Sequence, residues 1–74
     1  MTLRELRESR LWTQAVLAQR LGVQVPTVSN WERGEQRPQM TMMSRLAAAF
    51  GLTPAEITAV IDENAKAKND SFAM

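Results

Sequence analysis

Apolar residues recur three and four positions apart along most of the chain, which is the spacing that lines them up on one face of a helix. This recurrence predicts helices over residues 2–10, 13–22, 25–33, 40–50 and 53–61. No stretch alternates apolar and polar residues as a half-buried strand would, and there is no internal repeat. The pattern therefore predicts an all-α bundle of five short helices.

The expected helix ends carry residues that cap helices. Thr2 with Glu5, and Thr53 with Glu56, have the spacing of a capping box, in which each side chain bonds the other residue's backbone N–H. Glycine follows three of the expected helices, at positions 22, 34 and 51, where a left-handed residue commonly ends a helix. The periodicity fades towards the C-terminus. We therefore expect one domain over residues 1–67 and a frayed tail over 68–74.

The same periodicity assigns side chains to the core. It predicts that Trp12 and Trp31 anchor the core and that Met42 is more exposed than the neighbouring methionines. It also predicts that Arg20 is solvated on the outer side of its helix. The side chains expected to point inward are Leu3, Leu6, Val16, Leu17, Ala18, Leu21, Val28, Met40, Met43, Leu46, Ala47 and Phe50.

The composition narrows the chemistry that this domain can perform. A chain of 74 residues that is 45% hydrophobic can build one small core. The absence of cysteine excludes disulfides and thiolate metal sites, and the absence of histidine removes the commonest general base and metal ligand. We therefore expect no enzymatic activity, no metal and no cofactor. No apolar run reaches the ~20 residues of a membrane span, so we expect a cytoplasmic protein without a membrane partner.

Charge is divided unevenly along the chain. The net charge is +1, but residues 1–50 carry seven Arg and four Glu, whereas residues 51–74 carry four acids and two Lys. The basic part uses only arginine, whose planar guanidinium suits bidentate recognition of phosphate or guanine. A solvated surface with scattered ion pairs would show the same composition, so charge alone does not identify a partner.

The expected third helix has two different faces. On a helical wheel of about 100° per residue, Val28 and Trp31 fall on one side, while Pro26, Asn30 and Arg33 fall on the opposite side, flanked by Thr27 and Ser29. Asn and Arg are the side chains whose paired donors and acceptors match adenine and guanine edges. The outward face is therefore a candidate for contact with DNA bases, although exposed Asn and Arg are common on any surface.

Glu32 lies towards the buried side of the same helix. A buried carboxylate needs a cationic partner, and Arg7 lies on the apolar face of the first helix. We therefore expect an Arg7–Glu32 ion pair that locks the first helix against the third.

Two helices separated by a short turn after Gly22 have the layout of a helix-turn-helix. With "LRELRE", "TQAVLAQRLGV", "TVSNWERGEQRP" and "RLAAAFGLTPAEI", residues 3–57 resemble the lambda-repressor/Cro-type helix-turn-helix family. The resemblance implies a five-helix DNA-binding domain with the motif in helices two and three. The residues that match the family pattern in order are Gln14, Leu17, Ala18, Gly22, Val28, Ser29, Glu32, Gly34 and Pro38.

The resemblance implies a role for each matching position. It places helix three in the major groove, and it places phosphate contacts at the start of helix two and in the loop after helix three. An Arg–Glu pair like Arg7–Glu32 also occurs in the family. The implied base contacts are Val25, Pro26, Thr27, Asn30 and Arg33; the implied phosphate contacts are Thr13, Gln14, Ser29, Gln36 and Arg37.

The sequence departs from the family pattern in two places. Leu11 stands where the family often has a glycine at the end of the first helix, so that turn must be closed without glycine. Val25 and Pro26 are apolar where many members carry polar base readers. We expect these two to contact thymine methyl groups, which leaves directional readout to Asn30 and Arg33.

The resemblance favours a small prokaryotic or phage transcriptional regulator that binds double-stranded DNA. A helix this short reads only a few base pairs, so we expect a homodimer on a near-palindromic operator. Ile57, Val60 and Ile61 could form the dimer surface or could instead close the core. The alternatives are an antitoxin-type module with a protein partner, which also binds its own operator, and a helical bundle that has lost DNA binding.

Overall fold

The structure is a computed structural model that describes the backbone of residues 1–73 and the side chains of residues 1–65. All regular structure in that part of the chain is helical, as predicted. The helices are α1 (Leu3–Ser9), α2 (Gln14–Leu21), α3 (Val25–Glu32), α4 (Met40–Phe50) and α5 (Pro54–Ala73). None of the described helices is long and apolar enough to cross a membrane.

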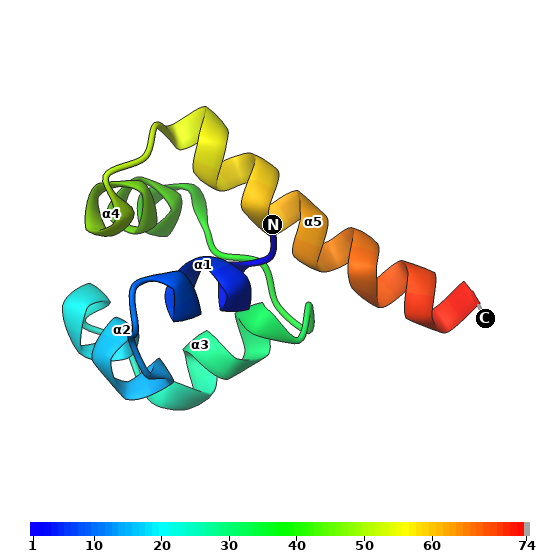
Figure 1. Ribbon diagram of the computed structural model, residues 1–74, viewed down its shortest axis with the longest axis horizontal. Coiled ribbons are helices and arrows are strands. Elements are labelled where there is room, and N and C mark those ends of the chain that lie inside the picture. Colours follow the sequence, from blue (N-terminus) through cyan, green and yellow to red (C-terminus); the bar gives the residue numbers. More distant parts are fainter. Residues whose placement is uncertain (74) are drawn as a thin grey trace.

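α1 packs against α3 and α5, and in the view of Figure 1 it lies between the α2–α3 pair and α4. α2 packs against both α3 and α4, and α5 packs against α4, α1 and α3. The N-terminus therefore lies beside α5, although the two segments are far apart in the sequence (Figure 1).

Each of the five helices contributes one aliphatic side chain that is completely buried. These side chains are Leu3, Leu17, Val28, Leu46 and Ile57, all 0% exposed. They belong to one continuous cluster with Trp31 and Phe50. Since burying a side chain of this size contributes about 1.5–3 kcal/mol, the core depends on every helix being in place.

Two methionines of α4 exchange the places that periodicity predicts for them. Met40 is 86% exposed, whereas Met42 is half-buried and packs against the core. Met40 is the first residue of α4, where the chain has not yet come over the core. Val16, predicted to point inward, is only half-buried.

Arg20 is not merely solvated, contrary to the prediction. Its guanidinium carbon lies 4.3 Å from the ring centroid of Trp12, a cation–π geometry. Trp12 in turn stacks against Phe50 with ring centroids 5.0 Å apart. Arg10 joins this cluster of Arg20, Trp12 and Phe50, because its Nη2 donates a hydrogen bond to the Phe50 carbonyl at 2.8 Å.

The three residues considered for a dimer surface lie inside the single chain. Ile57, Val60 and Ile61 are 0%, 8% and 3% exposed and belong to the core cluster. They face α4 and the rest of the bundle, so they close the core and offer no free apolar surface to a second copy.

α5 extends past the segment that periodicity predicts, and a buried polar residue anchors the extension. Asn64 is 4% exposed; its Oδ1 accepts from the Leu3 N–H at 2.9 Å and its Nδ2 donates to the Trp31 carbonyl at 3.2 Å. One amide thus ties α5 to both α1 and α3. The side chains of residues 66–74 lie outside the described part, and fraying over 68–74 stays a prediction.

Both predicted capping boxes are formed. The Thr2 N–H donates to the Glu5 carboxylate at 2.8 Å, and the Glu5 N–H donates to the Thr2 hydroxyl at 3.2 Å. Thr53 and Glu56 make the same reciprocal pair at 2.9 and 3.1 Å. In both boxes the backbone N–H bond, followed by the threonine hydroxyl, lowers the pKa of the glutamate.

Leu11 closes the turn between α1 and α2 in a strained conformation. Its φ is 59°, the left-handed region, and no other non-glycine residue of the described chain has a positive φ. Its side chain is 93% exposed and therefore gains little from packing. The position needs a backbone conformation that glycine adopts freely. This explains why a glycine is common there in the family that the sequence resembles.

We expect Leu11→Gly to stabilise the domain by about 1 kcal/mol, because it removes the left-handed strain of a Cβ-bearing residue and loses almost no buried surface. Leu11→Ala is the control, since alanine keeps Cβ and should bring no comparable gain. Urea denaturation of the three proteins measures the difference. Equal stability of the glycine and alanine variants would contradict the strain argument.

Stability should also fall in acid. The pKa values of Glu5 and Glu56 are lower in the folded chain than their ordinary 4.5, so ionisation favours folding above that pH, and this contribution is lost as the pH drops through the lowered values. The variant Glu5→Gln/Glu56→Gln keeps both capping boxes without a titrating group. The midpoint of thermal unfolding, measured at pH values above and below 4.5, should depend less on pH in the variant. An unchanged pH dependence would refute the assignment of this acid sensitivity to Glu5 and Glu56.

Candidate functional site

α2 and α3 are joined by a tight turn. Gly22 ends α2 with a φ of 71°, and the Val23 N–H donates to the Ala18 carbonyl at 3.0 Å. α3 then begins at Val25 with Pro26 in its first turn, where the missing N–H of proline is not needed. The first turn of α3 has no side-chain cap, so its backbone N–H groups are not satisfied by a neighbouring side chain.

The burial of α3 follows the two faces that the sequence predicts. Val28 and Trp31 are 0% and 5% exposed and hold the helix on the core. Val25, Pro26 and Arg33 are exposed, and the side chains of Thr27, Ser29 and Asn30 are half-buried along the edges. All five residues predicted to contact bases therefore lie on or beside the solvent face of one helix.

A nearly buried ion pair fixes α3 against α1, as the wheel argument predicts. Arg7 Nε donates to Glu32 Oε2 at 2.6 Å and Arg7 Nη2 to Glu32 Oε1 at 3.3 Å. The two side chains are 9% and 5% exposed. Arg7 Nη1 also donates to the Trp12 carbonyl at 2.6 Å. The hydrogen bond with Glu32 raises the pKa of Arg7, so the guanidinium stays charged.

The start of α2 joins the same network. Gln14 Nε2 donates to Glu32 Oε1 at 3.0 Å, which links the first residue of α2 to the last residue of α3. Thr13 caps α2, because its hydroxyl accepts from the Val16 N–H at 3.1 Å. Thr13 and Gln14, two of the residues predicted to contact phosphate, therefore already position α2.

A hollow of about 460 Å³ opens between α1, the start of α2 and the outer edge of α3. Its lining brings Gln14 and Ser29 together with the exposed end of Arg33. Arg4 also lines it, and the sequence analysis did not single out this residue. Its spacing of three from Arg7 puts it on the same side of α1, which is the signal that could have identified it. Arg4 pairs with Glu8 at 3.3 Å, and the two side chains are 69% and 54% exposed.

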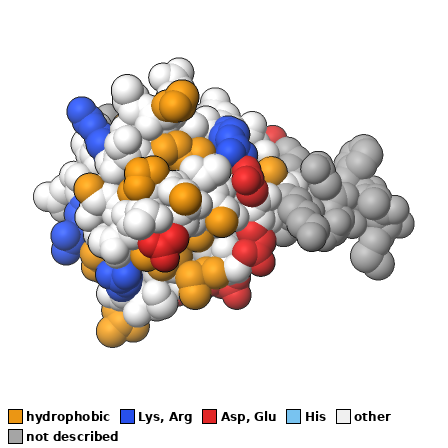
Figure 2. Space-filling model, turned by 90° about the horizontal axis from the view of Figure 1, so that it is seen from above, with side chains coloured by type: hydrophobic (Ala, Val, Ile, Leu, Met, Phe, Trp, Pro, Cys, Tyr) orange, Lys and Arg blue, Asp and Glu red, His pale blue; other side chains and the backbone are white. Residues whose placement is uncertain are grey.

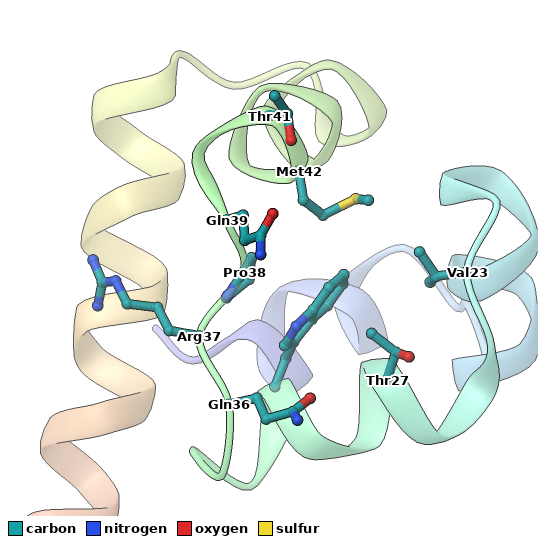
Figure 3. Close-up of a pocket in the computed structure, with 9 residues that line it drawn as sticks. Val23, Thr27, Gln36, Arg37, Pro38, Gln39, Thr41 and Met42 are labelled. Carbon is teal, nitrogen blue, oxygen red and sulfur yellow. The ribbon is translucent and has the colours of Figure 1, made fainter.

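A second hollow, of about 490 Å³, lies between α3 and the loop that leads to α4 (Figure 3). Gln36 and Thr27 line it beside Trp31. Arg37 also lines it, but its side chain extends towards α5 (Figure 3), where its Nη2 pairs with Asp62 at 2.7 Å. The loop residues predicted to contact phosphate thus face in different directions.

The exposed end of α3 carries an internal network. Arg33 Nη1 donates to the Ser29 hydroxyl, and Arg33 Nη2 donates to Asn30 Oδ1. Residues three and four positions apart lie side by side on a helix, so one guanidinium reaches both partners.

On the face seen from above, most of the visible Lys and Arg side chains lie towards the left of Figure 2, and the acidic side chains lie towards its centre and right. Within the described residues no group of three or more His, Cys, Asp and Glu side chains is arranged to hold a metal ion.

The family comparison agrees with this geometry. A family model described as helix-turn-helix matches residues 3–57, which include α1 to α4 and the start of α5. No curated protein and no solved structure matched the chain.

We expect Arg7→Met to destabilise the domain by about 3 kcal/mol or more, because it leaves the Glu32 carboxylate buried without a cation. The double variant Arg7→Met/Glu32→Leu should recover most of that loss, since no charge remains buried. Arg4→Met removes an arginine from the exposed Arg4–Glu8 pair of the same helix and should cost less than about 1 kcal/mol. Chemical denaturation tests this order, and equal losses for Arg7→Met and Arg4→Met would refute it.

Proposed function

Since the chain belongs to the lambda-repressor/Cro-type helix-turn-helix family of DNA-binding regulators, we propose that it binds double-stranded DNA sequence-specifically by inserting α3 into the major groove. The observation that carries this proposal is the Arg7–Glu32–Gln14 network. It holds the end of α3 against α1 and α2, so the outward side chains of α3 are presented on a rigid support.

The base contacts proposed are the five residues on the outer face of α3. Val25 and Pro26 carry no hydrogen-bonding side-chain group and would contact thymine methyl groups. Thr27, Asn30 and Arg33 would supply the polar readout. Val25 is 40% exposed at the first position of α3, which supports a contact made by the helix end that enters the groove first.

The phosphate contacts proposed lie on both sides of α3. Thr13, Gln14 and Ser29 belong to one side, with Arg4 added because it lines the same hollow. Gln36 and Arg37 belong to the other. Arg37 would leave Asp62 to reach a phosphate; both side chains are about half exposed, so breaking the pair costs at most about 1 kcal/mol.

We propose that the protein is a small prokaryotic or phage transcriptional regulator that binds a near-palindromic operator as a homodimer. The short α3 supports this, since a single copy contacts few base pairs and two copies on half-sites about one helical turn apart bind more tightly. Because Ile57, Val60 and Ile61 are buried in the core, the second copy would contact other residues. An antitoxin-type role with a protein partner is the alternative outcome.

Selection of bound duplexes from a random DNA library at near-physiological salt tests the proposal. This salt suppresses binding that rests on phosphate contacts alone. We expect enrichment of two inverted half-sites. Recovery of no sequence above background would refute specific recognition and direct the search to a protein partner.

The variant Asn30→Ala/Arg33→Ala should lose the preference for the selected duplex over random DNA by at least about tenfold, since it removes the polar readout. Arg45→Ala is the control, because it removes a positive charge from an exposed position of α4 outside both hollows. Fluorescence anisotropy with the two duplexes measures the ratio. A ratio that is unchanged in the double variant would exclude α3 as the reading helix.

A further inference from the structure

Arg33 is turned back onto its own helix. Its two terminal nitrogens donate to the Ser29 hydroxyl and to Asn30 Oδ1. Asn30 is thereby oriented by a cation that lies next to it on the same face. The backbone supports this arrangement, because the Asn30 carbonyl accepts from the N–H groups of Glu35 and Gln36 at 2.9 and 3.3 Å and so closes the end of α3.

The network decides which hydrogen-bonding groups remain for a ligand. An asparagine amide has one acceptor oxygen and two N–H donors, and a guanidinium has five N–H donors and no acceptor. Arg33 takes one lone pair of the Asn30 oxygen, and Asn30 Nδ2 and Arg33 Nε make no hydrogen bond to another residue whose side chain the structure describes. The outer surface of the pair is therefore dominated by donors.

We propose that Asn30 and Arg33 act as one unit that reads guanine, with Arg33 as the positioning residue that sets the specificity of Asn30. This inference rests on the proposed DNA binding and deepens it. Guanine presents two acceptors, O6 and N7, in the major groove, which suits a surface made of N–H donors.

Adenine would require the opposite arrangement. An asparagine reads adenine with both ends of its amide, because its oxygen accepts from N6 while its nitrogen donates to N7. Here the guanidinium bonds one lone pair of the oxygen, and its positive charge disfavours the approach of another N–H donor to the second lone pair. Removal of Arg33 frees the oxygen and converts Asn30 into an adenine reader.

The test is the duplex selection described above, carried out on the wild-type chain and on four variants. The base pair that the unit reads is the position at which Asn30→Ala abolishes the base preference. At that position we expect guanine for the wild-type chain and a change of at least about tenfold in the guanine-to-adenine ratio, towards adenine, for Arg33→Ala.

Two further variants separate positioning from simple loss of charge. Ser29→Ala removes the other partner of Arg33 but leaves the bond to Asn30 Oδ1, so guanine should persist. Asn30→Asp keeps an oxygen for Arg33 but replaces the free N–H groups by an acceptor, so the preference for guanine should be lost.

The outcomes distinguish this inference from the proposed function. No enrichment with the wild-type chain would overturn both. Enrichment with adenine at the position identified by Asn30→Ala, or with guanine that persists in Arg33→Ala, would overturn the inference while leaving specific DNA binding intact. Failure of Asn30→Ala to alter any position would also overturn it, because Asn30 would then read no base.

Discussion

The buried pair of Arg7 and Glu32 is the interaction on which the rest of the structure depends. A carboxylate that is 5% exposed is costly unless a cation satisfies it. Arg7 does so with two nitrogens and uses a third on the Trp12 carbonyl. The pair therefore sets both the position of α3 relative to α1 and the path of the chain as it leaves α1, and Gln14 extends the same constraint to α2.

A bundle of this size has little apolar surface to spare, so each helix must be held from more than one side. α5 illustrates this requirement. Ile57 packs into the centre of the core, while Asn64 bonds backbone groups of α1 and α3. The hydrogen bonds made by Asn64 satisfy polar groups that would otherwise be buried without partners, and no side-chain nitrogen or oxygen in the described part is left in that state.

The proposed interface combines rigid and adjustable parts. Gln14 and the inner face of α3 are held by the buried network, whereas Arg37 and Arg4 each pair with an acidic side chain of their own chain at the surface. Exposed pairs of this kind cost little to exchange. In the proposed complex, these two cations would keep defined positions without DNA and would be released to phosphates when DNA binds, while the backbone that carries them stays fixed.

The sequence by itself determined the five helices, their ends apart from the C-terminal end of α5, and the two faces of α3. Caps and periodicity act over a few neighbouring residues, so Thr2 with Glu5, the end of α2 at Gly22 and the inward position of Val28 could be predicted from local spacing alone. The Arg7–Glu32 pair was also predictable, because few cations lie on an apolar face. Leu11 was recognised as unusual only because a glycine is common at that position in the resembling family.

The tertiary structure decided which of the available faces are covered and by what. Periodicity could not tell that Met40 falls outside the core and Met42 beside it, nor that Ile57, Val60 and Ile61 pack within the chain and are not available to a second copy. The partners of Asn64 and Arg37 lie on distant segments. Such contacts depend on how complete helices are placed against each other. That placement minimises the exposed apolar surface of the whole chain at once. A local sequence pattern does not encode it.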